Sequence, residues 1–521
     1  MTKPTDGLEG PVVSESVAFA PRLPDRYADE SYKLFSKIHV GDPSLETSIA
    51  IRRKCVRWIL PFLCVGYHLM YVDKQTLGNS SILGILKNAH LNATQYNWLV
   101  SIFYFGYLLA EWPQNWALQR FPVAKWLAGN LTILGSILLL HIPCESFASL
   151  FVVRFLLGLA EACIVPSFQI ILSMFFTYDE QAVLMPCMWA VGNASPITSG
   201  LLSYGVLWIK TGSFASWKWF MLITEVITLI FAAAVFFWLP DSPLSAHFLS
   251  QEQRAQAILR IKSNHSGIEQ KRFKKYQFIE AIRDSKTWLF FFHAWGQEMS
   301  NGLTSQYSLI IQSFGFTTLQ TTLLGCVTGL VALVSLALAA IILAGTKNCR
   351  TWISAAYVPT FAASVLSLSL PWSDRWGLLV AIWLRSTTGI PYSVVMVWAA
   401  NCSAGHTKKT TVIALYHVGY GLGNILSPQL FQPQYRPRYP VTWGVILGIG
   451  CIFPMSLVIF LRYYLKQENK RRDGLQNERA TSEVGVLKHV NQHDETIGEE
   501  VVDARQLDLT DRENLAFRYV L

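Results

Sequence analysis

The chain has 521 residues, of which 52% are hydrophobic and only 15% are charged, and its mean hydropathy is +0.31. A soluble domain carries about 25% charged residues, so this composition excludes most soluble classes and indicates a lipid environment. The excess of 43 Lys and Arg over 34 Asp and Glu would also fit a nucleic-acid partner. The basic residues flank apolar runs, however, as they do beside membrane spans, so we expect a lipid bilayer and no nucleic acid.

The chain begins with a polar stretch of mixed charge that lacks a basic segment followed by an apolar one. This pattern predicts a disordered cytoplasmic tail at 1–54 and no cleavable signal peptide. The nine cysteines are scattered without a C-x-x-C pair, which argues against a disulfide framework and against a zinc site. We therefore expect no metal and no cofactor.

Twelve apolar runs follow, each long enough to cross a bilayer as a helix, which takes about 20 residues. The first six lie near 56–73, 96–117, 124–143, 147–172, 182–208 and 217–239. The second six lie near 287–313, 319–344, 351–371, 376–401, 411–431 and 441–464. The predicted domains are an N-terminal six-helix bundle, a central cytoplasmic loop, a C-terminal six-helix bundle and a cytoplasmic C-terminal tail, at 55–240, 241–286, 287–465 and 466–521. The tail is charged and weakly apolar from Glu468 onward, which predicts disorder.

The basic residues also predict the orientation. With the N-terminus in the cytoplasm, most Lys and Arg between the spans fall on the cytoplasmic side, and Lys74 is one of the few on the other side. The positive-inside rule thus places both termini in the cytoplasm, and we expect the plasma membrane. The first external loop then contains two N-x-S/T sequons, at Asn79 and Asn92, which are candidates for N-glycosylation. Sequons also arise by chance, so the alternative without a glycan stays open.

Two pairs of matching segments lie six spans apart and indicate an internal repeat. The fourth span reads Arg154-Phe-Leu-Leu-Gly158 and the tenth reads Arg385-Ser-Thr-Thr-Gly389. The fifth and eleventh spans each carry Gly-Asn shortly before a proline, at Gly192 to Pro196 and Gly423 to Pro428. The prediction is an all-α membrane protein with twelve transmembrane helices in two pseudo-symmetric six-helix bundles, the major facilitator fold.

Charged groups inside spans mark the candidate site, because each costs about 2.5–3.5 kcal/mol at the bilayer centre. Arginine forks suit an anionic substrate, and a buried Glu or His can carry a coupling proton. The candidates for substrate binding or coupling are Arg154, Glu161, His293, Glu298 and Arg385. The alternative is structural: Arg154 would pair with Glu111 or Glu161 to join neighbouring helices.

Other residues are assigned structural or gating roles. Glu111 stands beside Pro113 at an expected kink, and Gly158 allows two helices to approach closely. Arg120 and Lys125 are the basic residues between spans two and three. No G-x-x-x-x-G-K-[ST] segment occurs, which argues against an ATP-driven pump.

A series of motifs then occurs in order along the chain. They are Asp73-Lys-Gln-Thr-Leu-Gly-Asn79, Gln95-Tyr-Asn-Trp98, Phe103-Tyr-Phe-Gly-Tyr107, Glu111-Trp-Pro113, Leu118-Gln-Arg-Phe-Pro122, Arg154-Phe-Leu-Leu-Gly-Leu-Ala-Glu-Ala162 and, in the tail, Asp508-Leu-Thr-Asp-Arg-Glu-Asn514 with Phe517-Arg-Tyr519. This set resembles the fungal allantoate permease family, in the anion:cation symporter branch of the major facilitator superfamily. The resemblance implies proton-coupled uptake of a small organic anion or related metabolite, such as a carboxylate, vitamin, ureide or dipeptide.

The resemblance also bears on individual residues. It implies that Arg154 is the span-four arginine associated with coupling and substrate charge, and it gives Asp73 a structural or gating place after span one. Arg120 and Lys125 are what remains of the superfamily's loop 2–3 signature. The segment Glu180-Gln-Ala-Val-Leu-Met-Pro186 lacks the basic residue that relatives usually have in loop 4–5, which questions the gating contacts there.

The predicted function is that of a monomeric secondary transporter that carries an organic anion and protons across the membrane by alternating access. We do not expect an enzyme. Two alternatives stay open, namely an exporter of a secondary metabolite and a nutrient sensor that transports nothing. A membrane enzyme using His293 or His417 is disfavoured, because these histidines lie on different spans without metal-ligand spacing.

Overall fold

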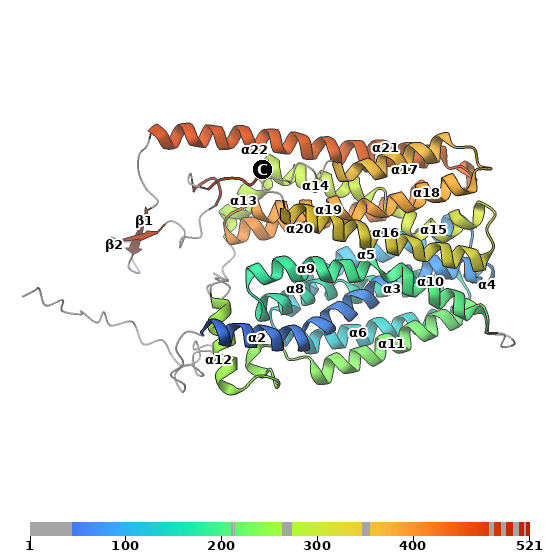
Figure 1. Cartoon of the computed structure of the whole chain (residues 1–521), viewed down its shortest axis with the longest axis horizontal. Coiled ribbons are helices and arrows are strands. Elements are labelled where there is room, and N and C mark those ends of the chain that lie inside the picture. Colours follow the sequence, from blue (N-terminus) through green and yellow to red (C-terminus); the bar gives the residue numbers. More distant parts are fainter. Residues whose placement is uncertain are drawn as a thin grey trace, which may run out of the picture.

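The computed structural model describes residues 44–209, 212, 214–262, 274–345, 355–478, 484–490, 496–503, 510–514 and 517–521. The helices form two bundles that lie side by side along a common direction (Figure 1). The start of α2, the helix α12 and the end of α22 lie at the same end of the molecule (Figure 1). We call this the tail end and the opposite one the far end.

The N-terminal bundle contains α2 (Leu45–Trp58), α3 (Leu60–Leu83), α4 (Ile85–Asn88), α5 (Ala93–Leu118), α6 (Val123–Leu139), α7 (Phe147–Glu161), α8 (Ile164–Phe175), α9 (Tyr178–Asn193), α10 (Ser195–Val206) and α11 (Ser216–Trp238). The connecting segment carries η2 (Pro243–Ser245), α12 (Gln251–Lys262) and α13 (Lys275–Arg283).

The C-terminal bundle contains α14 (Ser285–Glu298), α15 (Gly302–Ser313), α16 (Thr318–Gly345), η4 (Ala355–Tyr357), α17 (Val358–Ser369), α18 (Arg375–Arg385), η5 (Ser386–Thr388), α19 (Gly389–Asn401), α20 (His406–Leu426), η6 (Ser427–Leu430), η7 (Pro433–Tyr435), α21 (Pro440–Leu447), the π-helical turn η8 (Gly448–Ile452) and α22 (Phe453–Glu478). Two antiparallel strands follow, β1 (Val484–Val490) and β2 (Thr496–Asp503).

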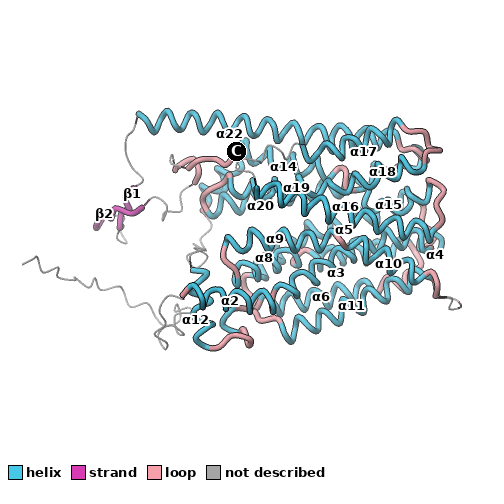
Figure 2. The backbone as a smooth tube through the Cα atoms, in the orientation of Figure 1, coloured by secondary structure: helices cyan, strands magenta, loops and turns pink. Residues whose placement is uncertain are grey.

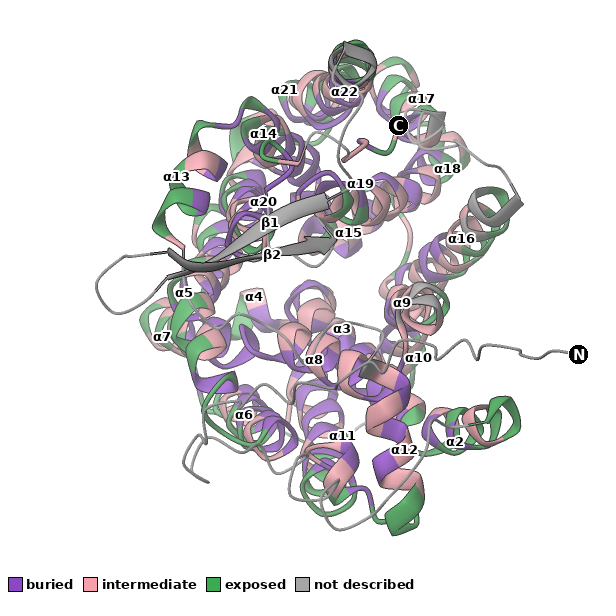
Figure 3. Cartoon of the chain, turned by 90° about the vertical axis from the view of Figure 1, so that its left-hand side faces the viewer, coloured by how far each residue is buried: buried purple, intermediate pink, exposed green. Residues whose placement is uncertain are grey.

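In chain order the crossings of the N-terminal bundle are α2 with α3, α5, α6, α7 with α8, α9 with α10, and α11. Those of the C-terminal bundle are α14 with α15, α16, α17, α18 with α19, α20, and α21 with α22. The loops between them lie at the two ends (Figure 2). Six of the helices are long and apolar enough to span a membrane by length and composition. Large apolar side chains such as Leu109, Phe237 and Ile341 are mostly exposed on the bundles. Figure 3, seen from the tail end, shows the exposed residues gathered on the outer faces of the two bundles, as lipid contact requires. The predicted two-bundle, all-α membrane architecture is confirmed.

Breaks in the helices follow the repeated motifs of the sequence. The fourth crossing breaks between α7 and α8, and the tenth changes to η5 directly after Arg385. The fifth crossing breaks at Ala194 just before Pro196, and the eleventh changes from α20 to η6 beside Pro428. Proline removes a backbone donor and clashes with the preceding turn, so these prolines account for breaks at matching places in the two halves.

The first crossing corrects the sequence interpretation. Hydropathy ends the first span at 73 and puts Lys74 in an external loop, but α3 continues to Leu83 and carries Asp73 and Lys74 near its middle. Both residues line a cavity between the bundles. A hydropathy scan scores polar side chains in the same way whether they face a loop or a buried polar cavity, which explains the error.

The two glycosylation candidates differ in position. Asn79 lies inside α3, where its Nδ2 atom is buried and its Oδ1 atom accepts a hydrogen bond from Ser308 Oγ of α15 at 3.2 Å. The structure contradicts the prediction of a glycan at Asn79, because the Nδ2 atom that would carry the glycan is buried within a helix that faces the cavity between the bundles. Asn92 is exposed and caps α5 by accepting a hydrogen bond from Gln95 N at 2.8 Å, so glycosylation there stays a prediction.

The C-terminal tail also differs from expectation. The prediction of disorder from Glu468 is wrong for α22, which continues to Glu478. It is also wrong for the C-terminal segment, defined as residues 510–514 and 517–521, which packs against the C-terminal bundle. Lys286 Nζ lies 2.5 Å from Asp511 Oδ2, and Lys408 Nζ lies 2.7 Å from Asp511 Oδ1. The tail charges that look solvated in the sequence thus meet buried opposite charges from two helices.

Candidate functional site

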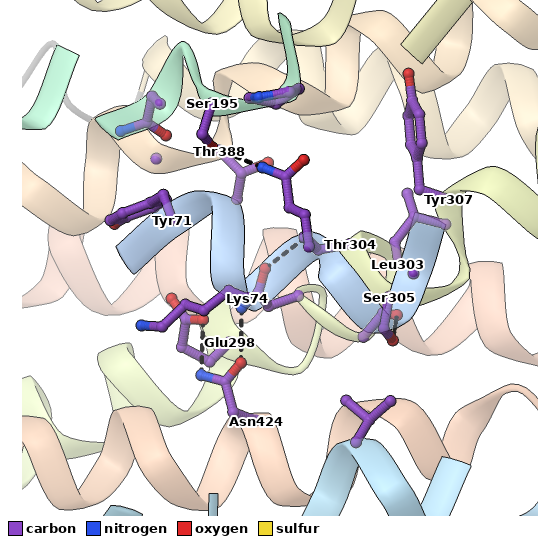
Figure 4. A pocket seen from close by; sticks show the side chains of 18 of the residues that line it. Tyr71, Lys74, Ser195, Glu298, Leu303, Thr304, Ser305, Tyr307, Thr388 and Asn424 are labelled. Atoms are coloured by element: carbon purple, nitrogen blue, oxygen red, sulfur yellow. Dashed lines mark hydrogen bonds between the residues drawn. The ribbon is translucent and has the colours of Figure 1, made fainter. Parts of the chain in front are cut away.

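A cavity of ≈ 340 Å³ lies between the two bundles. Both halves of the chain contribute to its wall, with α3, α5 and α7 on one side and α14, α15, α16 and the η5 region on the other. Figure 4 shows Lys74 of one bundle and Glu298 and Asn424 of the other facing into the same space. The cavity is thus placed where alternating access by the two halves would expose it in turn.

Hydrogen bonds close the bundles against each other at the far end. Tyr96 OH donates to the Ser305 carbonyl oxygen at 2.7 Å, and Gln306 Nε2 donates to Asn97 Oδ1 at 2.6 Å. Ser101 Oγ donates to the Ile425 carbonyl oxygen at 2.7 Å. These contacts join α5 to α15 and α20, so polar groups connect the two bundles at the far end.

The ion pairs at the tail end described next do not join the two bundles. Each lies within one bundle or links it to α12 or α13 of the connecting segment. Glu180 on α9 pairs with Arg52 at 3.4 Å and with Arg260 of α12. Lys408 on α20 pairs with Glu280 of α13 at 2.8 Å. Glu180 of loop 4–5 is therefore paired with basic residues, which come from α2 and α12 and not from the loop itself.

The N-terminal half of the site is a cluster of five buried or half-buried charged groups. Lys74 Nζ lies 3.1 Å from Glu161 Oε1. Arg154 is 4% exposed and interacts electrostatically with Asp73, Glu161 and Glu225. The alternative that Glu161 pairs with Arg154 is not what the structure has, because Lys74 is the closer partner. Three carboxyl groups therefore share two cations.

Several atoms of this cluster lack hydrogen-bond partners within the described part of the chain. They are Arg154 Nε and Nη2, Asp73 Oδ1 and Glu225 Oε2. Polar atoms buried without partners are costly, so native proteins retain them mainly where a ligand, proton or water completes the set. This half of the site can accept an anion at Arg154 and a proton at a carboxylate.

The C-terminal half of the site is arranged around a break in the seventh crossing. Glu298 is the last residue of α14, and its Oε2 atom accepts a hydrogen bond from Asn424 Nδ2 at 3.0 Å. Asn301 Nδ2 donates to Asn424 Oδ1 at 2.6 Å. Arg385 donates to Thr388 Oγ1 and to the backbone oxygen of Ser300. Both Glu298 and Arg385 line the cavity, as their predicted role requires.

Several tyrosine side chains also line the cavity. The ring centroids of Tyr104 and Tyr420 are 6.3 Å apart, and those of Tyr392 and Tyr420 are 5.4 Å apart. Lys74 Nζ lies 5.5 Å from the centre of the Tyr71 ring. These residues come from α3, α5, α19 and α20, so the rings span both bundles.

His293 and Glu111 do not line the cavity. His293 Nε2 is 2.9 Å from Tyr357 OH, which also donates to Gln297 Oε1, and the imidazole stacks on Tyr416. This network joins helices within the C-terminal bundle, so the structure does not bring His293 to the candidate site. Glu111 is half-buried on α5.

Gly158 makes the close helix contact that the sequence predicts. A Cβ atom there would lie 2.0 Å from the Phe103 carbonyl oxygen, and one at Gly106 would lie 2.3 Å from that of Phe155. The two glycines therefore let α5 and α7 approach to backbone contact, which positions Arg154 one turn away.

Arg120 and Lys125 lie at the tail end, outside the cavity. The Arg120 guanidinium stacks on Trp116 at 4.4 Å, and Lys125 Nζ donates to the Phe236 carbonyl oxygen. Asp241 Oδ1 accepts hydrogen bonds from the backbone nitrogens of Ala124 and Lys125 at 2.9 and 3.1 Å, which caps α6. These contacts tie the third crossing to the end of the sixth.

Sequence reasoning missed two residues of the cavity wall. Lys74 reads as a loop residue, and Asn424 belongs to the repeated Gly-Asn motif that marks a helix break. Glu225 is recognisable in the sequence as a charge inside the sixth span, but it is not among the candidates, and in the structure it lies near Arg154 without lining the cavity. The repeat is the one signal that could have assigned Asn424, because it places the residue six spans from Asn193, which also lines the cavity.

Comparison with known proteins is consistent with this geometry. Residues 63–428 match the family described as Major Facilitator Superfamily. An uncharacterised transporter of Schizosaccharomyces pombe is 33% identical over 100% of this chain and 92% of its own length. In Saccharomyces cerevisiae, a high affinity cysteine transporter is 30% identical over 96% of each chain, and allantoate permease is 30% identical over 95% of this chain and 90% of its own. The solved D-xylose-proton symporter has a TM-score of 0.60 at 10% identity, covering 78% of this chain and 97% of that one, and shows the shared fold.

Proposed function

Because this chain belongs to the major facilitator superfamily and is a multi-pass membrane transporter, we propose that it takes up a small organic anion or related metabolite by proton-coupled symport. The observation that carries the proposal is the N-terminal charge cluster, in which three carboxyl groups share two cations in the bundle interior. An excess buried negative charge is costly, and binding a proton removes it.

The ion pair of Lys74 and Glu161 supplies a route for coupling. A proton on Glu161 weakens its attraction for Lys74, whose side chain is 19% exposed and lines the cavity. Lys74 and the partnerless nitrogens of Arg154 then hold the carboxylate of the substrate. Proton and anion thus favour each other's binding, which is the thermodynamic requirement for symport.

The orientation completes the proposal. The tail end faces the cytoplasm, as the positive-inside rule predicts, and the chain acts as a monomer in the plasma membrane. The hydrogen bonds that join the bundles at the far end then correspond to an inward-facing state. Relatives named for cysteine and for allantoate, both of which carry a carboxylate, support a small carboxylate-bearing substrate.

Uptake into proteoliposomes tests the proposal. Purified protein is reconstituted, a proton gradient is imposed, and accumulation of radiolabelled L-cysteine, allantoate and a panel of carboxylic acids is measured. Accumulation should be abolished by a protonophore and by Lys74→Ala, and Glu161→Gln should make uptake independent of the gradient. Glu111→Gln, a carboxylate outside the cavity, is the matched control and should keep coupling. Uptake that ignores both protonophore and pH would refute symport, and efflux from preloaded vesicles alone would indicate an exporter.

A further inference from the structure

Only one of the two oxygens of the Glu298 carboxylate accepts a hydrogen bond from a described residue. Asn424 donates to Oε2 at 3.0 Å, whereas no group among the described residues donates to Oε1. Glu298 also has no ion pair there, because Arg385 is held by Thr388 and by the backbone of Ser300. The carboxylate therefore presents a free acceptor to whatever occupies the cavity.

Four tyrosines share the cavity with this carboxylate. Tyr71, Tyr104, Tyr392 and Tyr420 line the cavity, and each interacts electrostatically with Glu298. The face of a tyrosine ring attracts cations, and aromatic cages are a recurrent means of binding ammonium groups. A carboxylate with a free oxygen in a cavity that several tyrosines also line is thus suited to a cationic nitrogen.

The charge balance points in the same direction. The N-terminal and C-terminal halves of the site together contain four carboxyl groups, at Asp73, Glu161, Glu225 and Glu298. They contain three basic groups, at Lys74, Arg154 and Arg385. A substrate that is only an anion adds a second excess negative charge to the site and brings no positive charge to pair with Glu298. A substrate that carries both charges adds none.

From these observations we propose that the substrate is a small zwitterion, with its carboxylate held by Lys74 and its cationic nitrogen held by Glu298 and the tyrosine rings. Lys74 and Glu298 lie on opposite bundles, face the same cavity and interact electrostatically (Figure 4). A zwitterion therefore bridges the two halves, and Glu298 determines specificity by requiring the nitrogen. The inference rests on the proposed transport function and deepens it by naming the substrate class.

Binding to purified protein in detergent tests the inference without any proton gradient. The probes are matched pairs that differ only in the amino group: L-alanine and propionate, L-cysteine and 3-mercaptopropionate, L-phenylalanine and 3-phenylpropionate, and γ-aminobutyrate and butyrate. Thermal shifts are recorded as a function of ligand concentration. At least one amino compound should bind about tenfold to a hundredfold more tightly than its partner, the range expected for one charge-assisted hydrogen bond.

The variants assign that preference to Glu298. Glu298→Gln should abolish the preference, and Glu298→Asp, which keeps the charge, should retain part of it even if the glutamine variant folds poorly. Glu111→Gln should behave as wild type. Equal binding of both members of every pair, or a preference that survives Glu298→Gln, would overturn the inference. Preferential binding of zwitterions together with protonophore-insensitive uptake would uphold this inference and refute symport. Failure of the inference and failure of the proposed symport thus give different results.

Discussion

Replacing Asp511 by Asn should release the C-terminal segment from the bundle. The Asp511 carboxylate is fully buried and lies 2.5 Å from Lys286 Nζ and 2.7 Å from Lys408 Nζ, and it accepts a hydrogen bond from Tyr519 OH at 2.6 Å. The substitution keeps the shape of the side chain and removes its charge. Two buried ammonium groups then lose one of the carboxylates that they share, while Asp284 remains 3.4 Å from Lys286 Nζ.

The cost follows from the burial of both partners. Removing one partner of a buried ion pair destabilises a protein by about 3–5 kcal/mol, because the other charge stays buried and uncompensated. Asp284 remains 2.9 Å from Lys408 Nζ, so we expect the lower end of this range, about 3 kcal/mol. Adding Lys408→Met removes one stranded charge, so the double variant should lose less stability than the two single variants together.

The dependence on pH follows from the same contacts. Burial alone would raise the pKa of the Asp511 carboxyl, but the Lys286 and Lys408 ammonium groups together outweigh this effect and hold the pKa below its ordinary value. A carboxyl with a depressed pKa contributes its full stability above the pKa of the unfolded state, about 3.9 for Asp, and loses it as pH falls further. Attachment of the segment should thus be constant from pH 8 to about 5 and weaken below about pH 4.

Thermal unfolding in detergent and limited proteolysis of the C-terminal segment measure both effects. Asp473→Asn is the matched control, because Asp473 pairs with Arg518 at 2.8 Å with 61% of its own side chain exposed. Exposed pairs contribute about 0–1 kcal/mol, so this variant should unfold like wild type. If Asp511→Asn is as stable and as protease-resistant as Asp473→Asn, the reasoning from burial is refuted.

Three further predictions follow from the positions of single residues. Gly158→Ala places a Cβ atom 2.0 Å from a backbone oxygen of α5 and should lower stability by about 1–3 kcal/mol in thermal unfolding, whereas Gly129→Ala, with open space around it, should not. If the protein is glycosylated in its native host, Asn92→Gln should remove the mobility shift caused by a glycosidase and Asn79→Gln should not, and the reverse result would contradict the burial of Asn79. Arg385→Lys should reduce uptake at least about tenfold, since Lys cannot make the two hydrogen bonds of the guanidinium together, and unchanged uptake would contradict the predicted role of Arg385 in substrate binding or coupling.

Much of the fold could be predicted from the sequence, because apolar runs and basic flanks report directly on a lipid environment. The repeat also located Arg154 and Arg385, and both line the cavity. Lys74 could not be assigned in this way. Its neighbours Asp73 and Gln75 are polar, so the segment reads as a loop, and only the packing of α3 against the other bundle shows that these side chains face a cavity.

The C-terminal segment was missed for a different reason. Its charged residues have the composition of a solvated tail, and the partners of Asp511, Lys286 and Lys408, lie more than a hundred residues away in the chain. Composition averages over neighbours in sequence, whereas a buried ion pair is a contact between distant segments. The family motif around Asp511 was the available signal, and it gave no indication of where the segment binds.

The helix breaks place three charged side chains at the carbonyl ends of half-helices. Glu161 ends α7, Glu298 ends α14 and Arg385 ends α18. The carbonyl end of a helix carries a partial negative charge of about half an electron, which stabilises a cation and repels a carboxylate. Arg385 is thus favoured by the peptide dipoles of its own helix, whereas Glu161 and Glu298 are opposed by theirs and depend on an external positive charge. Any change in helix winding at these breaks would alter that balance, so backbone conformation and ligand charge are linked within this cavity.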